Sequence, residues 1–550
     1  MRIGQPLKIK DCYISDRNNV SFASHKNKTE EQLRMGMHIR LALVLGLFLF
    51  YSTLCVRFEQ VEVQATNGYS VHNIDTGLNY TSIQGAINAS ETLNGHRIFV
   101  ESGIYCEHVV VNKSLSLIGE NRGTTIIDGN GTGVVVDPVY NITAIVEVAE
   151  NSVNISGFTI RNGGFHGIVL NGVADCTINQ VASLNSQSCI SLMNSTRNRI
   201  LNSVFSGGTW GIFLFNSTEN DIVSNMATEN LHAGIASGGP EGSSENLIAN
   251  NTLSDNFTPG SKVYGIGLDL VGSDNEISYN NMSNNTNGII LDHANRNQLK
   301  GNTILNNTNY GIWIWYGSNN TLFGNTIQQS GFVGLLWDDG TGNTFHHNNF
   351  VNNNYQTGYI WYVSDWDDGI EGNYWSDYTG EDGNNDGIGD TSYMIYEFGR
   401  DNHPLMGMFS SFNTINDRYV NVVSNSTIDD LEYSESDKTI RMQVSNSTVN
   451  QAFGFCRMSI PHALVSEPYN VTIDGADPTF WNYTLYDDGD NRWIYFSYEH
   501  PAREIVIIPE FSPLIITILF AMATQLAATG CKRKRWRSQR KEVNKNETDG

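Results

Sequence analysis

The chain has 550 residues, of which 40% are hydrophobic, 11% aromatic and only 16% charged, and its formal net charge is −24. This amount of apolar material predicts a packed interior and excludes an intrinsically disordered chain. The shortage of Lys and Arg leaves no basic stripe for phosphate contacts in the middle of the chain, so we expect no nucleic-acid partner.

Residues 1–65 are predicted to comprise a leading extension followed by a signal peptide or an N-terminal membrane anchor. The apolar run 41–56 is short, follows Arg40 and leads to a small-residue exit at Ala65. These features are typical of a secretory signal cleaved after Ala65, and a retained signal anchor is the alternative. Sequons are dense in the chain that follows, starting at Asn79, which fits an exported glycoprotein.

Residues 66–150 are predicted to form an N-terminal cap and the first coils of a repeat domain. The stretch "YTSIQGAINAS" and the stretch "RIFVESGIY" after it resemble the opening of pectin-lyase-like β-helices, which implies a short capping helix followed by a first strand. A solenoid needs an end that hides its open core, and this segment supplies one.

Residues 151–365 repeat a glycine, or a residue in its place, followed by an apolar residue, in steps of 22, 22, 23, 31, 23, 23, 23 and 24. Three short apolar alternations per repeat, without a stripe of helical period, predict a β-solenoid, here a right-handed parallel β-helix. The 31-residue step predicts an extruded loop. The positions are Gly167, Cys189, Gly211, Gly234, Gly265, Gly288, Gly311, Gly334 and Gly358.

Asparagines recur in two further phases of the repeat. We expect them at the corners between strands, where an Asn tolerates left-handed backbone angles and its amide can bond the Asn of the next coil in a ladder. The first phase is Asn198, Asn220, Asn246, Asn275, Asn297, Asn320 and Asn343; the second includes Asn251, Asn281, Asn302, Asn325 and Asn349.

Residues 366–406 are predicted to cap the other end and contain a motif that resembles a calcium loop. The stretch "EDGNNDGIGD" follows the spacing of an EF-hand-type loop up to its ninth position. The twelfth position should be Glu but is Tyr393, and Asp377 or Glu381 is the candidate for the missing oxygen. We therefore expect a structural Ca²⁺ ion, and hydrogen bonds alone are the alternative. The predicted ligands are Asp382, Asn384, Asp386, Ile388 and Asp390.

The last part of the chain is predicted to attach the protein to a membrane. Residues 407–508 alternate in short strands typical of a small β-sandwich. In 509–531, the tripeptide "PEF" precedes an uncharged apolar run long enough to cross a bilayer, and 532–550 is a basic tail expected on the cytoplasmic side. The chain between the two apolar segments is then outside the cell.

Three stretches resemble known families. The N-terminal "GENRGTTIIDG" resembles the first coils of pectin-lyase-like β-helices, and "GNYWSDYTGEDGNNDGIGDTSYMIYEFGRDNHPLM" resembles the terminal segment of NosD-like β-helix proteins. The "PEF" end resembles the C-terminal sorting signals of archaeal surface proteins. These resemblances imply an all-β protein on the cell surface: a single-stranded β-helix, a β-sandwich and a C-terminal transmembrane helix, or a lipid in its place after processing.

The candidate binding site is the outward position four residues after each repeated glycine. Carboxylates and aromatic side chains in one column would form a sugar groove, because rings stack on pyranose faces and carboxylates accept hydroxyl hydrogens. Trp337 and Trp361 point inward by alternation, and Trp366 is expected to thicken the aromatic patch. The predicted carbohydrate-binding residues are Asp269, Asp292, Trp313, Trp315, Asp338 and Tyr362.

Catalysis on a polysaccharide is the alternative function, as in glycoside hydrolases or lyases. Asp269, Asp292 and Asp338 are the candidate catalytic residues, with Asp269 and Asp292 expected about 5 Å apart. Polygalacturonase motifs are absent, and this wall offers no basic residue for a lyase. We therefore favour a glycan-binding, adhesive or structural role.

A copper accessory role, implied by the NosD resemblance, ranks third. Copper binds clustered His, Met or Cys side chains. His346 and His347 are adjacent, so on a strand their side chains would face opposite ways, and no metal cluster is expected there.

Overall fold

The computed structural model describes residues 70–137, 142–240, 242–358, 364–395, 399–465, 469–509 and 524–527. The predicted signal segment lies outside these ranges, and so does the predicted membrane span apart from 524–527. Within the described ranges, no helix combines the length and hydropathy needed to span a bilayer.

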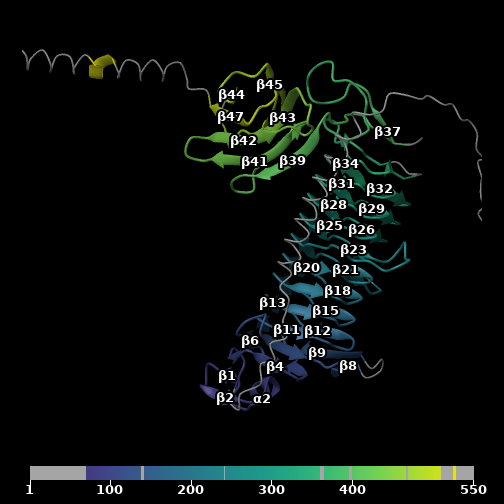
Figure 1. Ribbon diagram of the computed structural model, residues 1–550, viewed down its shortest axis with the longest axis vertical. Helices are drawn as coiled ribbons and strands as arrows, with labels where there is room; N and C mark the ends of the chain where they lie inside the picture. The colour runs from purple at the N-terminus through teal and green to yellow at the C-terminus, as the bar shows by residue number, and fades with distance from the viewer. Residues whose placement is uncertain are drawn as a thin grey trace, which may run out of the picture. The chain divides into compact units, whose positions relative to one another are not determined.

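Three walls of mainly parallel strands form a β-helix, and most coils add one strand to each wall (Figure 1). The strand Val71–Asn73, at the start, pairs antiparallel with both of its neighbours. Wall A has 13 strands. They are β1 (Val71–Asn73), β2 (Leu78–Tyr80), β3 (Arg97–Val100), β6 (Ser116–Gly119), β10 (Asn154–Ser156), β13 (Thr177–Asn179), β16 (Arg199–Leu201), β19 (Asp221–Val223), β22 (Leu247–Ala249), β24 (Glu276–Ser278), β27 (Gln298–Lys300), β30 (Thr321–Phe323) and β33 (Thr344–His346).

Wall B consists of a 6-stranded and a 5-stranded sheet in line, linked by isolated bridges through Thr252. The first holds β4 (Gly103–Tyr105), β7 (Thr125–Asp128), β11 (Thr159–Arg161), β14 (Ala182–Leu184), β17 (Val204–Ser206) and β20 (Met226–Thr228). The second holds β25 (Asn281–Ser283), β28 (Thr303–Leu305), β31 (Thr326–Gln328), β34 (Asn349–Val351) and β36 (Tyr374–Trp375).

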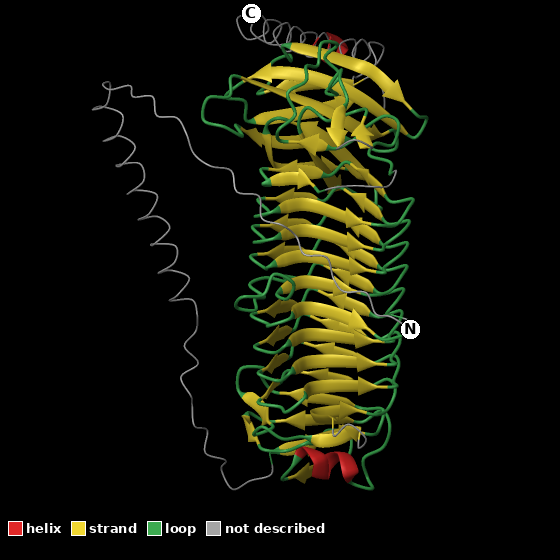
Figure 2. Ribbon diagram, turned by 90° about the vertical axis from the view of Figure 1, so that its right-hand side faces the viewer, coloured by secondary structure: helices red, strands yellow, loops and turns green. Residues whose placement is uncertain are grey.

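Wall C has the longest strands, and Figure 2 shows them stacked toward the viewer. Its strands are β5 (Val109–Val111), β8 (Val134–Asp137), β9 (Ile142–Val148), β12 (His166–Asn171), β15 (Ser188–Met193), β18 (Trp210–Phe215), β21 (Ala233–Gly238), β23 (Ile266–Leu270), β26 (Asn287–Asp292), β29 (Tyr310–Trp315), β32 (Val333–Asp338) and β35 (Tyr355–Thr357). Except for β8, which pairs with β9 antiparallel, its neighbours are parallel.

The interior is a continuous aliphatic column. Leu291, Leu299 and Ile304, one from each wall of a single coil, are all fully buried in the same cluster. Like residues lie over like in the next coil, because strand register is kept from coil to coil, as in Ile289 paired with Ile312. The β-helix predicted from the repeat is confirmed.

The glycine column differs from the prediction at the long step. A Cβ on Gly234 would meet the carbonyl oxygen of Gly267 at 2.9 Å, and one on Gly267 would meet that of Gly288 at 2.6 Å. Gly267, and not Gly265, therefore continues the column. At the end of the stack, Gln356 takes the place predicted for Gly358, because the carbonyl oxygen of Gln356 lies 2.6 Å from a Cβ built on Gly334. Backbones approach closely at the glycines of this column, so a larger side chain would not fit at those positions.

The predicted asparagine ladders are present, and they are buried. In the first, each Asn Nδ2 donates to the Oδ1 of the Asn one coil later, from Asn198 to Asn343, at 3.0–3.1 Å. The second runs from Asn225 to Asn373. A third passes through Asn230, Asn256 and Asn285.

Two predicted ladder members are wrong by one residue: Asn280 and Asn348 belong to the second ladder, in place of Asn281 and Asn349. The left-handed angle also belongs to the residue before the ladder Asn, because that residue makes the corner while the Asn side chain turns inward. At the first-ladder corners the left-handed residues are Arg197, Glu219, Glu245, Asp274, Arg296 and Asn319.

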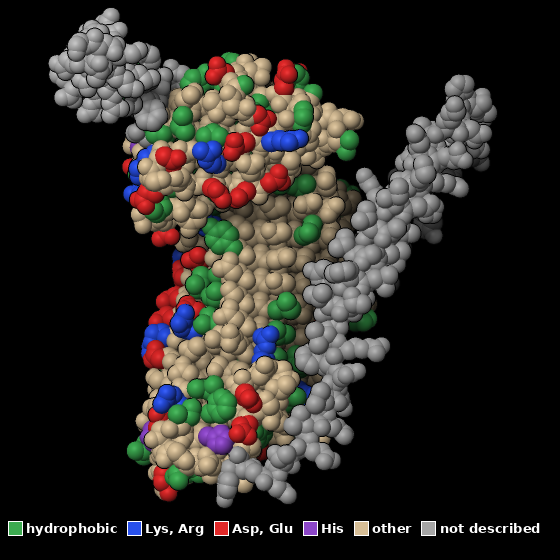
Figure 3. Space-filling model, turned by 60° about the vertical axis from the view of Figure 1, so that its left-hand side comes forward, with side chains coloured by type: hydrophobic (Ala, Val, Ile, Leu, Met, Phe, Trp, Pro, Cys, Tyr) green, Lys and Arg blue, Asp and Glu red, His purple; other side chains and the backbone are tan. Residues whose placement is uncertain are grey.

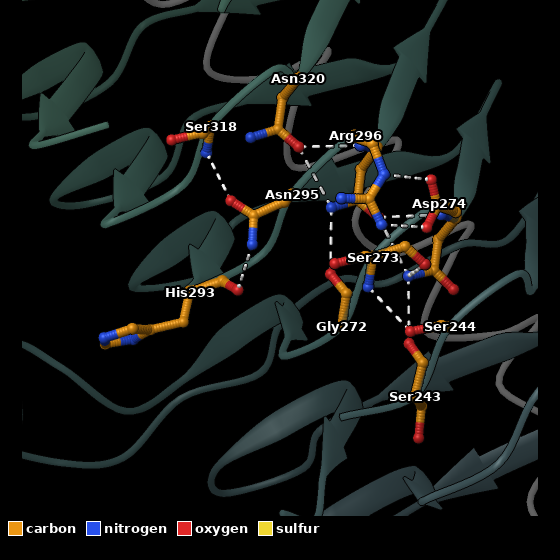
Figure 4. Close-up of polar contacts among 12 residues, drawn as sticks. Ser243, Ser244, Gly272, Ser273, Asp274, His293, Asn295, Arg296, Ser318 and Asn320 are labelled. Atoms are coloured by element: carbon orange, nitrogen blue, oxygen red, sulfur yellow. Dashed lines mark hydrogen bonds and ion pairs between the residues drawn. The ribbon is translucent and has the colours of Figure 1, made fainter. Parts of the chain in front are cut away.

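Corner residues with left-handed angles point outward and pair along the stack. Arg296 donates from Nε and Nη2 to the carboxylate of Asp274 on the preceding coil, at 2.8 and 2.6 Å (Figure 4). Beside them, Asn295 accepts from the backbone N–H of Ser318 at 2.9 Å. Elsewhere, in the view of Figure 3, the middle of the coil stack shows few charged side chains.

Both ends of the β-helix are covered. At the start lies the predicted helix, α2 (Ile83–Asn88), whose Ser82 side chain accepts from the N–H of Gly85 and whose first N–H groups donate to Glu107. At the other end lies a cap that includes β37 (Tyr393–Ile395) and β38 (Gly399–Asp401).

The predicted β-sandwich follows, as two antiparallel sheets around a shared core. One sheet holds β39 (Met408–Asn413), β40 (Tyr419–Ser424), β43 (Phe453–Pro461), β46 (Asn491–Glu499) and β45 (Phe480–Asp487); the other holds β41 (Thr427–Ser434), β42 (Thr439–Ser445), β47 (Glu504–Pro509) and β44 (Tyr469–Ile473). It contacts the last coils: Asn349 exchanges two hydrogen bonds with the backbone of Phe409.

Candidate carbohydrate-binding face and metal cluster

The outer face of wall C carries three columns of side chains. The repeated glycines are left out of the strand register of wall C. The residue before each glycine points outward, and so do the second and the fourth residue after it. We name these columns 1, 2 and 3. Column 1 includes Trp210, Ala233, Ile266, Asn287, Tyr310 and Val333; column 2 includes Phe213, Ala236, Asp269, Ile290, Trp313 and Leu336; column 3 includes Phe215, Gly238, Asp292, Trp315 and Asp338.

Aromatic rings run along this face in two groups. Toward the end of the stack, Trp313 lies 5.2 Å from Tyr310 and 5.8 Å from Trp315, and Trp315 lies 5.7 Å from Tyr316. Trp313 and Trp315 are nearly parallel, with 25° between the ring planes. The second group, nearer the start, includes Trp210, Phe213, Phe215, His232 and Tyr264. We call the two groups together the aromatic ribbon.

Between the two groups lies a small apolar patch on the outside of the wall. Ala233, Ala236, Ile266 and Ile290 are buried against one another, with Trp313 beside them. The loop produced by the long repeat step borders the patch, because Asn287 donates to the carbonyl of Val263 at 2.9 Å.

Each of the three predicted carboxylates has a partner on this face. Asp338 accepts from the indole Nε1 of Trp313 at 2.9 Å, which ties the ring to the next coil. Asp292 lies beside His293, and Asp269 lies 3.3 Å from Nε2 of His232. All three carboxylates thus point toward the ribbon.

The predicted pairing of Asp269 with Asp292 is not found. Asp269 pairs in register with Ile290, two residues before Asp292, because Gly267 and not Gly265 continues the column. Two residues along a strand and one strand across give about 8 Å between their Cα atoms, rather than neighbouring positions in one column. Asp292 and Asp338 do share column 3, with Trp315 between them.

Two imidazoles supply basic groups on this wall that were not predicted from the sequence. His232 precedes β21 and His293 follows β26, and each contacts one of the predicted carboxylates. His293 also stacks on Tyr316 at 5.1 Å. The statement that the wall offers no basic residue is therefore wrong, because corner residues can reach the edge of the face.

Other aromatic predictions had mixed outcomes. Trp337 is buried in the interior column as predicted. Trp366, expected in the outer patch, is also buried there, 4.5 Å from the ring of Phe345, because it covers the end of the column. Trp361 and Tyr362 lie outside the described residues. Trp210 and Tyr310 were not predicted to lie on this face. Their signal in the sequence is their position, one residue before the repeated glycines Gly211 and Gly311.

Burial and neighbouring carboxylates change the ionisation of side chains on the aromatic ribbon. Partial burial and the nearby charge of Asp338 raise the pKa of Tyr310. The side chains of Asp269 and Asp292 are 22% and 33% exposed, so their oxygens remain accessible to a ligand. Rings for stacking and carboxylates for hydroxyl hydrogens lie within one face, which is the chemistry that sugar binding requires.

The calcium-like loop is held by its own hydrogen bonds in the structure. Asp382 accepts from the N–H groups of Asp386 and Gly387 at 3.0 and 2.9 Å, and Asp390 accepts from Gly383 at 2.8 Å. Asn384 donates to Asp386, and the Ile388 N–H donates to the same carboxylate. Burial, with the nearby charge of Asp386, raises the pKa of Asp382.

In the part of the chain that the structure describes, one group of three possible metal ligands lies close together, and it lies outside the calcium-like loop. One ligand atom from each of His346, His347 and Asp368 lies within 4.8 Å of the others. The prediction that His346 and His347 face opposite ways is wrong. His347 has a φ of 62°, the left-handed angle of a corner before the ladder residue Asn348, and this turn brings the two Nδ1 atoms to 2.9 Å.

Comparisons with known proteins agree with the fold. A family model described as "Periplasmic copper-binding protein (NosD)" matches residues 241–380, and one described as "Right handed beta helix region" matches residues 143–267. Together the two matches span residues 143–380 of the β-helix. A curated relative, the "Cell surface glycoprotein" of Methanothermus fervidus, is 36% identical over 108 residues, which are 20% of this chain and 16% of that protein. The chain thus spans about a sixth of that relative's length.

Solved structures with a similar fold include three proteins. The Dettilon tailspike protein (gp208) has a TM-score of 0.39 at 13% identity, over 74% of this chain and 86% of that one. The A-module of the Azotobacter vinelandii mannuronan C-5 epimerase AlgE4 has a TM-score of 0.37 at 16% identity, over 51% of this chain and 92% of that one. The catalytic domain of a GH87 α-1,3-glucanase has a TM-score of 0.38 at 14% identity, over 50% of this chain and 64% of that one. At these values the likeness concerns the fold alone.

Proposed function

We propose that the outer face of wall C binds a polysaccharide and that the chain does so as an extracytoplasmic surface protein. The observation that carries the proposal is the pair of near-parallel indoles, Trp313 and Trp315, flanked by Asp292 and Asp338. Stacking on rings and hydrogen bonds to carboxylates are the two interactions that sugar hydroxyls and ring faces need. Similarity to an archaeal cell surface glycoprotein and dense sequons support the location.

The face favours a chain-like ligand over a small one. Columns 2 and 3 continue over several coils, so equivalent positions repeat at about the 4.8 Å strand spacing along the stack. A polysaccharide lying along the stack would meet an indole or a carboxylate on successive coils. We therefore expect affinity to rise with oligosaccharide length.

A panel of acidic and neutral polysaccharides tests the proposal, with the full-length protein and calcium present. Affinity electrophoresis should show retardation by at least one polysaccharide, and Trp315→Ala should weaken it. The matched control is Phe480→Ala, which removes an aromatic side chain of similar exposure from the β-sandwich, 44% against 40%. Retardation that is unchanged in Trp315→Ala, or absent with every polysaccharide, would contradict the proposal.

Cleavage of the bound polysaccharide is a second candidate function. It is favoured by the two His–Asp contacts, because an imidazole beside a carboxylate can act as a general base. New reducing ends or unsaturated uronates that disappear in Asp292→Ala would support catalysis. Binding without product supports an adhesive or structural role, which we favour because Asp269 and Asp292 do not occupy neighbouring positions in one column.

We also propose that a calcium ion has an architectural role in the loop 382–390. The spacing of Asp382, Asn384, Asp386 and Asp390 supports it, and so does the position of Glu381, whose carbonyl accepts from the Asp390 N–H at the neck of the loop. The loop also contacts the β-sandwich, because Arg457 donates to the carbonyl of Asp386 at 2.8 Å. Calcium there would stabilise the cap over the last coil.

A further inference from the structure

The outer face of wall C carries carboxylates but neither Lys nor Arg in its columns. Between β12 and β32, no residue of columns 1, 2 and 3 is Lys or Arg. Asp269, Asp292 and Asp338 lie in these columns, and Glu147 of β9 continues column 2 beside Val169. Binding sites for carboxylate or sulfate groups ordinarily use Arg or Lys, which donate charge-assisted hydrogen bonds. The columns therefore lack the side chains that recognition of an acidic sugar requires.

Cations at the borders of the face leave its net charge negative. Arg197 and Arg296, at corners that follow β15 and β26, each donate two hydrogen bonds to an aspartate of the preceding coil, so their charges are paired. Lys262 is exposed on the loop beside the apolar patch, where its backbone carbonyl accepts from Asn309 at 3.2 Å. This one lysine does not balance the four carboxylates of columns 2 and 3.

The carboxylates of the face can receive hydrogens but cannot supply them. An ionised carboxylate only accepts hydrogen bonds, whereas a hydroxyl group can donate one. Asp338 accepts through Oδ2 from Nε1 of Trp313 at 2.9 Å, and Oδ1 of Asp292 lies 2.5 Å from Nδ1 of His293. Sugar hydroxyl groups can serve as further donors to these carboxylates. A uronate or sulfate group would instead bring a second acceptor of the same charge, and no proton would lie between the two groups.

Column 3 repeats this arrangement on both sides of an indole. Asp292, Trp315 and Asp338 follow one another on three successive coils, about 4.8 Å apart. A sugar ring stacked on Trp315 is therefore flanked by a carboxylate on each side. Two like unit charges about 4 Å apart in water weaken binding roughly fivefold, and an acidic ring would meet this repulsion twice. Salt screens the repulsion, because the Debye length falls from about 30 Å at 0.01 M to about 3 Å at 1 M.

We propose that the outer face of wall C binds an uncharged polysaccharide and rejects polymers of uronic acids or sulfated sugars. Hydroxyl groups of the ligand donate to Asp292 and Asp338 while one of its rings stacks on Trp315. This inference rests on the proposed function and adds to it the chemical class of the polysaccharide.

The test compares neutral polymers with their own oxidised forms, in titration calorimetry of the full-length protein. The probes are a β-1,3-glucan, a glucomannan and a soluble starch, each used before and after oxidation of its primary hydroxyl groups to carboxylates, so that the backbone and linkages stay the same. The buffer is at pH 8, above the range in which an imidazole ordinarily titrates, and contains no added calcium, because Ca²⁺ can bridge two carboxylates. In about 0.01 M salt, at least one neutral probe should bind more than about 10-fold more tightly than its oxidised form, and this ratio should approach one in about 1 M salt.

Asp292→Asn combined with Asp338→Asn keeps oxygen acceptors at both positions but removes both charges, and should bring the ratio at low salt close to one. Asp477→Asn is the matched control, because it removes an exposed carboxylate between β44 and β45 of the β-sandwich and should keep the wild-type ratio. Circular dichroism checks the fold of each variant. If the double variant does not fold, Asp292→Asn alone should still lower the ratio about fivefold.

The possible failures can be told apart. Absence of binding to every probe, neutral and oxidised, would contradict the proposed function and this inference with it. Wild-type binding to the oxidised form that is as tight as to the neutral form, and that is weakened by Trp315→Ala, would overturn this inference alone. A ratio that stays at its wild-type value in the folded double variant would also overturn it.

Discussion

Replacing one ladder asparagine should destabilise the β-helix much more than replacing an exposed asparagine of the same coil. Asn302 is 1% exposed and takes part in four side-chain hydrogen bonds. Its Nδ2 donates to the carbonyl of Ile277 at 2.7 Å and to Asn325 at 2.9 Å, and its Oδ1 accepts from the backbone N and from Nδ2 of Asn280 at 2.9 and 3.0 Å. Asn302→Ala removes all four.

The magnitude follows from which groups lose their partners. The buried backbone N–H of Asn280 keeps no acceptor, at a cost of about 1–3 kcal/mol, and the other lost bonds cost about 0.5–1.5 kcal/mol each. We therefore expect the free energy of unfolding to fall by about 2.5–7.5 kcal/mol. Asn306→Gly is the control, because Asn306 is exposed with a φ of 55°, which glycine adopts without strain. Urea titration followed by circular dichroism measures both, and equal losses in the two variants would refute the ladder as a stabilising element.

Three further predictions concern the cap and the two kinds of tryptophan. Glu371→Gln should lower the free energy of unfolding by about 3 kcal/mol at pH 7, because the pKa of Glu371 in the folded protein, about 2, lies below its ordinary value of 4.5. The difference in stability between wild type and variant should disappear as the pH falls from about 4.5 to 2. A stability difference that stays constant across that range in urea titrations would contradict this prediction. Calcium at 100 times its dissociation constant should stabilise the wild-type protein by about 2.7 kcal/mol, seen as a higher melting temperature, but should leave that of Asp382→Asn unchanged; no effect of a chelator on the wild type would leave the loop to hydrogen bonds alone. Trp337→Ala should cost about 3–5 kcal/mol and Trp315→Ala under about 1 kcal/mol in the same denaturation assay, because only Trp337 is buried; comparable losses would mean that the two indoles are not on opposite sides of the wall.

The β-helix itself could be predicted because its signals are local and repeated. Alternation with a period of two places Leu291 inside and Asp292 outside, and the same pattern recurs on each coil. The ladders could be predicted in kind, because a buried amide needs partners and the next coil supplies them. Their exact members could not, since "NN" pairs leave a one-residue ambiguity that only the corner geometry resolves.

The candidate site was harder to predict where insertions or backbone angles decide the geometry. A 31-residue step tells how many residues a loop adds but not where the register resumes, and this misplaced Asp269 by two positions. The meeting of His346 and His347 depends on one left-handed angle. The signal was present, because a left-handed residue precedes the ladder Asn at corner after corner, and His347 precedes Asn348.

The central claim is that the outer face of wall C binds a polysaccharide. Hydroxyl-radical footprinting of the full-length protein tests it most directly, with and without a polysaccharide that retards the protein in affinity electrophoresis. Trp313, Trp315 and Tyr310 should be oxidised more slowly when the polysaccharide is bound, whereas the exposed Phe480 of the β-sandwich should react at an unchanged rate. Protection of Phe480 with no change at the two indoles of wall C would contradict the account.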